Sequence, residues 1–239
     1  MLNASTLMLE IEQNGFAISE GILSAPQVAH LLSALQRIDQ SASVRKRGGI
    51  FAVRNLLDVS PEVRELAASA HIRKLVEPIL GTEFFPVRGI LFDKIPEANW
   101  KVPWHQDVTI AVREKVEAEG FGPWSMKADV LHVQPPAYVL ESMISVRLHL
   151  DLCTEDNGAL RVIPASHRLG RIPEDRIAAI REATPEQVCA VVTGGALLMR
   201  PLLLHASSPS QVPGHRRVIH IDFASVQLPN GMMWFSEAA

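Results

Sequence analysis

The stretch that decides the fold of this chain is Trp104-His105-Gln106-Asp107-Val108-Thr109, which follows Pro103 and opens an apolar, β-branched run. Such a run favours a strand, and we expect one over about 104–111. Residues two apart in a strand point to the same face, so His105 and Asp107 would project together. The motif therefore offers an imidazole and a carboxylate that one metal ion could share.

A third metal ligand must come from elsewhere in the chain, and the best candidate is His205, in the apolar segment 202–207. Two histidines and one carboxylate with open positions form the facial triad of non-haem Fe(II) oxygenases. A His-x-Asp pair is weak evidence when it stands alone. Of the nine histidines, His30 and His71 lie on predicted helices without an acidic partner at ligand spacing, and we expect them to be structural.

An arginine, Arg216, follows His205 by eleven positions. If 203–205 and 216–223 are neighbouring antiparallel strands, Arg216 lies near the metal, where its guanidinium can bind a carboxylate through two hydrogen bonds. Ser207 shares the face of His205 if the strand continues. Both residues are therefore candidates for holding a carboxylate beside the metal.

The composition sets the class of protein. The 239 residues are 47% hydrophobic and 21% charged, with a net charge of −3, which is typical of a chain that buries a core. No basic stripe indicates nucleic-acid binding, and no apolar run reaches the roughly 18 residues of a membrane span. The early Glu10 and Glu12 argue against a signal peptide, and two cysteines, Cys153 and Cys189, fit a reducing, cytoplasmic setting. The oligomeric state is not readable.

Helices come first along the chain and strands follow. Helices are predicted over 4–13, after the Ser24 cap, from Ser60 and over 71–80, with a basic, glycine-rich loop over 42–50. Strands are predicted over 84–92, 104–111, 143–152, 159–163, 188–192, 196–204 and 216–226. This order indicates one α+β domain over 1–239, mainly β, in which a helical third (1–82) packs outside a β core (84–226).

Two insertions interrupt the predicted core, over 113–142 and 166–185. Long ordered loops beside a site often form lids over it. The first insertion carries four candidates for stacking and hydrogen bonding with a substrate, namely Trp124, His132, Gln134 and Tyr138. The alternative is a packed lid with Trp124 in its core.

Several motifs together resemble one enzyme family. They are His105-x-Asp107, His205 followed by Arg216, the segment 91–96 that leads to Trp104, and Asn157-Gly158-Ala159-Leu160-Arg161-Val162-Ile163-Pro164-Ala165-Ser166-His167. This set is similar to the phytanoyl-CoA dioxygenase family of Fe(II)/2-oxoglutarate oxygenases. The likeness covers about 84–226, with a looser match in the helical third.

The resemblance implies a double-stranded β-helix, which is a cupin-like jelly-roll barrel, with the metal inside one mouth. It implies that His105, Asp107 and His205 bind Fe(II), and that Arg216, assisted by Ser207, binds the far carboxylate of 2-oxoglutarate. The expected reaction consumes O2 and 2-oxoglutarate, releases succinate and CO2, and hydroxylates an unactivated C–H of a small molecule. Related halogenases lack the carboxylate ligand, so Asp107 favours hydroxylation.

Three positions differ from the family pattern or match it only loosely. Arg147 stands where family members often carry a Trp beside 2-oxoglutarate. It alternates with His149 and Asp151, and could contact 2-oxoglutarate or a substrate anion, or lie on an exterior face in salt bridges. Arg54 lies near the place of a family Lys that reaches the same pocket. Ala165 replaces a usual Gly in a turn, where Ala is tolerated only if φ is negative.

Two other functions remain open at this point. The first is a cupin-like metalloenzyme that does not use 2-oxoglutarate, against which Arg216 and Ser207 argue. The second is a non-catalytic metal-binding or sensor protein with a degenerate site, against which the complete ligand set argues. The identity of the substrate (a CoA ester, free acid, amino acid or natural product) cannot be read from the sequence.

Overall fold

The computed structural model describes residues 3–38, 44–46, 50–127, 129–212 and 214–236. Its helices are α1 (Ala4–Asn14), α2 (Ala25–Gln36), α3 (Leu56–Val59), α4 (Pro61–Ala67), α5 (Ala70–Leu80), α6 (Ala137–Glu141) and α7 (Glu174–Ala183), with short 3-10 turns at Ser166–Leu169 and Pro229–Gly231. Its strands are β1 (Phe16–Ser19), β2 (Val44–Lys46), β3 (Ile50–Arg54), β4 (Phe85–Lys94), β5 (Val102–His105), β6 (Ile110–Val112), β7 (Trp124–Lys127), β8 (Val130–Val133), β9 (Met143–His149), β10 (Leu160–Val162), β11 (Gln187–Cys189), β12 (Ala196–Met199), β13 (His205–Ser207) and β14 (Arg216–Ala224).

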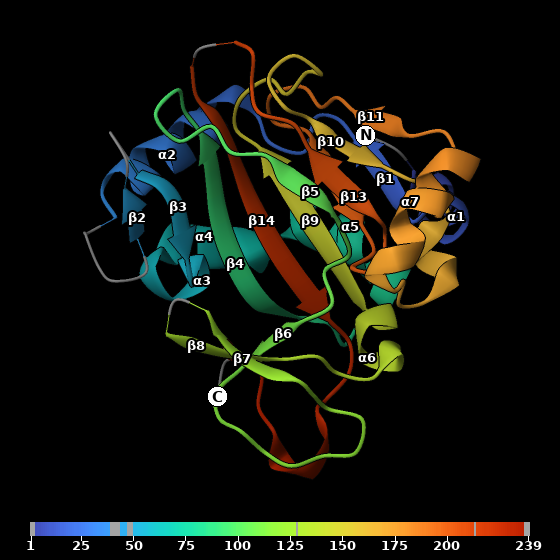
Figure 1. Ribbon diagram of the computed structural model, residues 1–239. Coiled ribbons are helices and arrows are strands. Elements are labelled where there is room, and N and C mark those ends of the chain that lie inside the picture. Colours follow the sequence, from blue (N-terminus) through green and yellow to red (C-terminus); the bar gives the residue numbers. More distant parts are fainter. Residues whose placement is uncertain (1–2, 39–43, 47–49, 128, 213, 237–239) are drawn as a thin grey trace.

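Two antiparallel sheets face each other and form the core (Figure 1). The larger sheet has seven strands in the order β1-β12-β9-β14-β4-β3-β2, and the smaller has four in the order β11-β10-β13-β5. These described strands make two facing sheets of a jelly roll with helices outside, which confirms the predicted fold class. A third, three-stranded sheet, β6-β8-β7, lies at the lower end of β4 in Figure 1.

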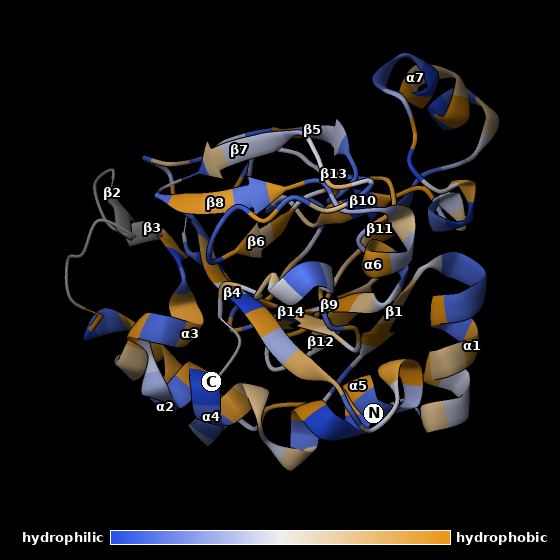
Figure 2. Ribbon diagram, turned by 90° about the horizontal axis from the view of Figure 1, so that it is seen from below, coloured by the Kyte–Doolittle hydropathy of each residue, from blue (hydrophilic) through white to orange (hydrophobic). Residues whose placement is uncertain are grey.

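The N-terminal helices cover the outer face of the larger sheet, whereas the smaller sheet lies on its other side (Figure 2). Ser24 caps α2 with a capping box, and Val28, Leu31 and Leu35 of that helix are buried. Their partners in the same core cluster include Val146 on β9. Because burial of each such side chain contributes about 1.5–3 kcal/mol, this apolar layer fixes the helices to the sheet.

Alternation along β9 gives the larger sheet two different faces. Ile144, Val146 and Leu148 belong to the helix-side core, so the intervening Arg147 and His149 point into the space between the sheets. All seven residues of β9 are buried. Buried polar groups on the inner face need partners, which makes this space the place to look for a site.

Three expectations about local structure are wrong. The predicted strand over 104–111 is two strands, β5 and β6, separated by residues 106–109, and the predicted strand over 196–204 ends at Met199. The predicted loop over 42–50 contains the strand β2 and the first residue of β3; its residues 42–43 and 47–49 lie outside the described parts. Hydrophobic patterns within one segment do not show where a strand stops pairing with its neighbours, so the ends of these strands could not be predicted from them.

No helix in the described parts of the chain is long and apolar enough to cross a membrane.

Candidate metal centre

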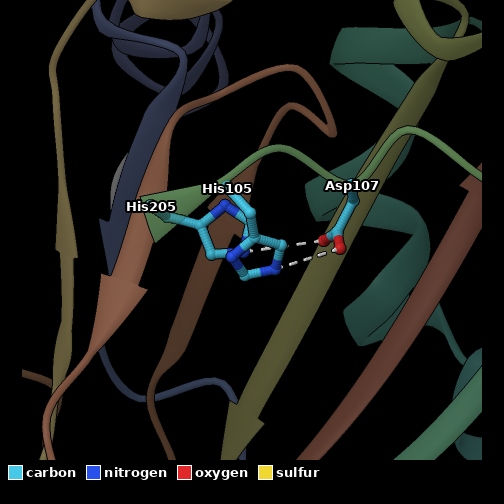
Figure 3. Close-up of side chains that lie close together, drawn as sticks. All are labelled: His105, Asp107 and His205. Atoms are coloured by element: carbon cyan, nitrogen blue, oxygen red, sulfur yellow. Dashed lines mark ion pairs between the residues drawn. The ribbon is translucent and has the colours of Figure 1, made fainter. Parts of the chain in front are cut away.

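The three predicted metal ligands lie together between the sheets (Figure 3). His105 ends β5 and pairs directly with His205 at the start of β13. The Asp107 carboxylate lies 3.7 Å from the Nε2 atom of each histidine. One ligand atom from each residue falls within 4.8 Å of the others, which suits a shared metal ion.

Hydrogen bonds fix which nitrogen of each imidazole faces the site. The Nδ1 atom of His105 lies 2.8 Å from the carbonyl oxygen of Pro103, and that of His205 lies 2.8 Å from the carbonyl oxygen of Leu203. A carbonyl only accepts, so both Nδ1 atoms carry the proton and both Nε2 lone pairs face Asp107. A metal-binding histidine is oriented in the same way by its second nitrogen.

The charge states also suit a metal. Burial lowers the pKa of His205 to about 4, against the raising effect of Asp107, so the imidazole is neutral at pH 7. Burial disfavours the charged form of Asp107, but His205 and His105 outweigh it and lower the pKa of this carboxyl. Neutral imidazole and ionised carboxylate are the forms that ligate.

Gln106 lies between His105 and Asp107 and is buried. Its side chain joins the irregular segment after β5 to neighbouring segments by hydrogen bonds. Its Nε2 atom donates to the carbonyl oxygens of Leu202 (2.6 Å) and Gly170 (2.8 Å), and its Oε1 atom accepts from the Ile172 backbone (2.7 Å). The Asp107 N–H donates to the carbonyl oxygen of Pro201. These bonds, rather than a continuous strand, hold Asp107 beside His105.

A cavity of about 200 Å³ opens from the three ligands between the sheets. Its far end carries Arg216, Ser207 and Lys94, all at least 95% buried. The ammonium of Lys94 donates to Ser207 Oγ (2.7 Å) and to the Ser208 carbonyl oxygen, and Ser207 donates to the Gly158 carbonyl oxygen. Burial, followed by the charge of Arg216, lowers the pKa of Lys94 to about 7.

No described carboxylate lies within 4 Å of the nitrogens of Lys94, Arg147 or Arg216. The Nε atoms of both arginines are buried without a hydrogen bond. Burial and then the charge of Arg216 lower the pKa of Arg147 to about 10. Asp107 and Asp222 attract Arg147 only from beyond 4 Å. Buried cations without a carboxylate in contact are costly, so this end of the cavity suits an anion.

The chain matches the family model "Phytanoyl-CoA dioxygenase (PhyH)" over residues 11–218. It belongs to the phytanoyl-CoA dioxygenase family. The resemblance predicted from the motifs is confirmed, and membership supports the predicted class, an iron- and 2-oxoglutarate-dependent oxygenase. No curated protein matches the sequence.

Solved structures share the fold at low sequence identity. AviO1 from Streptomyces viridochromogenes Tue57 is 23% identical, with a TM-score of 0.70, and the match covers 96% of this chain and 98% of the AviO1 chain. EctD from S. alaskensis with 2-oxoglutarate and 5-hydroxyectoine is 21% identical, with a TM-score of 0.73 and coverages of 94% and 77%. The epimerase SnoN in complex with Fe3+, alpha ketoglutarate and nogalamycin RO is 17% identical, with a TM-score of 0.71 and coverages of 99% and 92%.

Arg216 reaches the cavity by a different route from the one predicted. The segments around His205 and Arg216 are not neighbouring strands: β13 belongs to the smaller sheet and β14 to the larger. Arg216 faces the cavity across the gap between the sheets, and its side chain is 4% exposed. The premise was wrong because separation along the sequence does not say in which sheet a strand pairs.

Arg147 lines the cavity, whereas Asp151 lies beyond the end of β9 and forms an ion pair with Arg217. Arg147 Nη1 donates to His220 Nδ1 (2.9 Å), so the proton of His220 is on Nε2, which donates to Asp222 (2.8 Å). The exterior alternative for Arg147 is therefore wrong, since its side chain is 7% exposed and faces inward.

The other candidates lie outside the cavity lining. Arg54 lies opposite Ile90 in the antiparallel β3–β4 pair, and its side chain is not among those that the structure shows lining the cavity. The same holds for Trp124, His132, Gln134 and Tyr138. Trp124 packs against an apolar cluster that includes Val133, as in the packed-lid alternative, and Tyr138 is 50% exposed.

Lys94 lines the cavity but was not predicted as a site residue. Arg88, Ile90, Phe92 and Lys94 all line the cavity and alternate along β4. The predicted strand ended at residue 92, two positions too early. Side chains alternate between the two faces of a strand, so extending the strand by two residues past Phe92 would have placed Lys94 on the same face as Phe92.

Ala165 departs from its expected conformation. Its φ is +62°, in the left-handed region, rather than negative. The turn is held by neighbouring bonds, because the Ala165 N–H donates to the Asn14 carbonyl oxygen (2.8 Å) and Ser166 Oγ accepts from the Leu204 N–H (2.8 Å). The phytanoyl-CoA dioxygenase family usually has glycine here, which adopts this conformation without strain.

Proposed function

We propose that this protein is an Fe(II)- and 2-oxoglutarate-dependent oxygenase that hydroxylates an unactivated C–H bond of a small molecule and releases succinate and CO2. The observation that carries the proposal is the convergence of His105, Asp107 and His205, with both Nε2 lone pairs facing the carboxylate, at one end of a cavity whose other end holds uncompensated cations.

His105, Asp107 and His205 would hold the iron. Two imidazoles and one carboxylate are the donor set of the facial triad, which leaves positions for other ligands. With 2-oxoglutarate and O2 the metal supplies the oxidising power, and the protein supplies binding and orientation. The buried Gln106 keeps the two motif ligands in place through its three hydrogen bonds.

Arg216 would bind the distal carboxylate of 2-oxoglutarate, with Ser207 and Lys94 beside it. Arg216 offers parallel N–H donors, and Ser207 and Lys94 are already hydrogen-bonded to each other. An arriving carboxylate would replace the missing counter-charge at this buried end. Arg147 extends the same positive region toward the metal ligands, fixed by its hydrogen bond to His220.

The apolar part of the cavity would exclude water from the reacting centre. Ile90, Phe92, Val102 and Leu160 line it between the charged groups. Asp107 supports hydroxylation over halogenation, since a carboxylate occupies the position that a halide would need. SnoN and SnoK of this fold are described as an epimerase and a carbocyclase, and product analysis distinguishes hydroxylation from these outcomes.

The test is an anaerobic titration of the Fe(II) protein with 2-oxoglutarate, in which visible absorption is recorded at each addition. We expect a charge-transfer band that needs both ligands, and then succinate release in air from a screen of small carboxylic acids and amino acids. A protein that binds Fe(II) but gives no band with 2-oxoglutarate would indicate a cupin-like metalloenzyme. A protein that binds neither would indicate a non-catalytic role.

A further inference from the structure

The cavity-lining face of β4 carries a cation at each end. Arg88, Ile90, Phe92 and Lys94 follow one another on this face, with two apolar side chains between the charged ones. A strand rises about 3.3 Å per residue, so the backbones of Arg88 and Lys94 are roughly 20 Å apart. The two cations therefore serve different ends of the cavity.

The proposed cosubstrate cannot occupy both ends. The five-carbon chain of 2-oxoglutarate contains four C–C bonds of about 1.5 Å, so its terminal carbons are roughly 5 Å apart. With one end beside Arg216 and Lys94 and the other at the metal, the molecule does not extend to Arg88. Any anion at Arg88 belongs to a second ligand.

Arg88 forms no ion pair within 4 Å in the described parts of the chain, although its charge, after that of His220, helps to lower the pKa of Asp222 against the opposing effect of burial. Its neighbour across the β4–β14 pair is Asp222, but Asp222 Oδ1 accepts hydrogen bonds from Ser145 (2.6 Å) and His220 (2.8 Å). No described carboxylate oxygen lies within 4 Å of the Arg88 guanidinium. Arg88 is only half-buried, so a ligand that enters the cavity can reach it.

Lys127 adds to the positive charge at this end. It comes from β7, in the three-stranded sheet beside the start of β4 (Figure 1). Its Nζ atom donates to Thr109 Oγ1 (3.0 Å), two residues after Asp107. Lys127 is not itself among the side chains that line the cavity, but burial and then the charge of Arg88 lower its pKa, as expected from the position of β7 beside the start of β4.

The lining as a whole has an excess of positive charge. Among the described side chains that form it, Asp107 is the one carboxylate, against Arg88, Lys94, Arg147 and Arg216. A divalent metal would add two positive charges, and 2-oxoglutarate would bring two negative ones. An excess of positive charge therefore remains after 2-oxoglutarate binds. Arg88 contributes to this excess, because it lies beyond the reach of the cosubstrate.

We propose that the substrate is a small organic anion, whose carboxylate or phosphate group binds Arg88, assisted by Lys127. This inference rests on the proposed function. The anchored group lies at the β7–β8 end, and the apolar part of the substrate extends over Ile90 toward the metal ligands. The cavity of about 200 Å³ is below the roughly 300–1,000 Å³ of most ligand pockets, so only a small molecule or one end of a larger one enters.

The test compares matched anionic and neutral compounds, so that charge is the only variable. The anaerobic Fe(II) protein is first saturated with 2-oxoglutarate, which fills the Arg216 end, and the charge-transfer band is recorded. Calorimetric titrations then use hexanoate against hexanamide and hexyl phosphate against hexanol. We expect the anion of at least one pair to bind about tenfold or more tightly, because charge-assisted hydrogen bonds are roughly twice as strong as neutral ones. The pair with the larger ratio distinguishes carboxylate from phosphate.

Variants assign the preference to Arg88. In Arg88→Gln the anion-to-neutral ratio should fall below about threefold, whereas Arg88→Lys should keep most of it and Lys127→Gln should lower it in part. Arg73→Gln, on the outer helix α5 where Arg73 pairs with Glu77, is the matched control and should keep the full ratio. If Arg88→Gln does not fold, Arg88→Met takes its place, and an anion-to-neutral ratio that is unchanged in that variant would overturn the proposal.

Two results separate this inference from the proposed function. Equal affinity within both pairs, or an unchanged ratio in Arg88→Gln, overturns the anionic substrate while the band still supports the oxygenase. Absence of the band overturns the oxygenase itself.

Discussion

His105 and His205 face each other across the β5–β13 pair, with ring centroids 4.3 Å apart, although they come from distant parts of the sequence. Each ring is fixed by a hydrogen bond from Nδ1 to a backbone carbonyl two residues earlier. The pair is therefore oriented by the backbone of the smaller sheet, before any metal arrives. Asp107 completes the set from the irregular segment that follows β5.

Replacing Asp107 tests the metal centre. In Asp107→Ala the two imidazoles remain but the carboxylate of the predicted ligand set is lost, so we expect Fe(II) or Mn(II) affinity to fall about 100-fold or more, and succinate release to be abolished. Calorimetric metal titration and succinate release measure the two effects. Glu155→Gln, at an exposed carboxylate, is the control and should bind metal normally. Full activity of Asp107→Ala would refute its role as a ligand.

Adjacent arginines on β14 provide a test of the cosubstrate end. Arg216 faces the cavity, whereas Arg217 pairs with Asp151 at 2.8 Å on the other face. Loss of one partner of a buried ion pair costs about 2 kcal/mol or more, so Arg216→Gln should weaken 2-oxoglutarate binding about 30-fold or more. Arg217→Gln should leave this affinity within about twofold. Equal effects in the two variants would contradict the assignment of Arg216.

If Lys94 lies beside bound 2-oxoglutarate as proposed, its lowered pKa predicts that cosubstrate binding depends on pH. Its pKa is about 7 in the free protein, and a bound carboxylate favours the charged ammonium. Above pH 7, binding must therefore take up a proton, and we expect the Kd of 2-oxoglutarate to rise with pH by up to about tenfold per unit from pH 7.5 to 9. Calorimetry in buffers of different ionisation enthalpy measures the proton uptake. Lys94→Met should bind 2-oxoglutarate weakly and without proton uptake. If the Kd of the wild type did not change with pH, protonation of Lys94 on binding would be excluded.

The same shift predicts how stability depends on pH. Because the pKa of Lys94 is lower in the folded than in the unfolded chain, the unfolded state binds more protons between about pH 7 and 10.5. The contribution of Lys94 to the free energy of unfolding therefore increases as pH rises through this window. Thermal unfolding measures this effect: the melting temperature of the wild type, relative to that of Lys94→Met, should increase from pH 7 to 10. A constant difference would mean that the lysine is not desolvated.

The left-handed Ala165 predicts a stabilising substitution. An L-residue in this region costs about 1–2 kcal/mol, of which about 0.4–1 kcal/mol is offset by the greater entropy of glycine in the unfolded chain. Ala165→Gly should therefore raise the melting temperature by about 2–4 °C. Gly158→Ala gives the opposite case, because φ is +82° and a Cβ atom would lie 2.5 Å from the Ser208 carbonyl oxygen. A lower melting temperature for Ala165→Gly would show that the turn carries no strain.

The sequence by itself determined the residue types of the site and the order of its elements. The His-x-Asp motif, His205, Arg216 and the run from helices to strands all follow from local patterns, and the family motifs supported them independently. Local patterns were sufficient here because capping, alternation and ligand type are properties of neighbouring residues.

Only the tertiary structure decided how these residues meet. Arg216 reaches the site from the opposite sheet, Lys94 from a strand longer than predicted, and Asp107 from a break that Gln106 stabilises. Arg88 shares its strand face with Lys94 but lies at the other end of the cavity. The physical reason is that strand pairing and sheet assignment depend on contacts between residues far apart in the chain, which alternation within one segment does not encode.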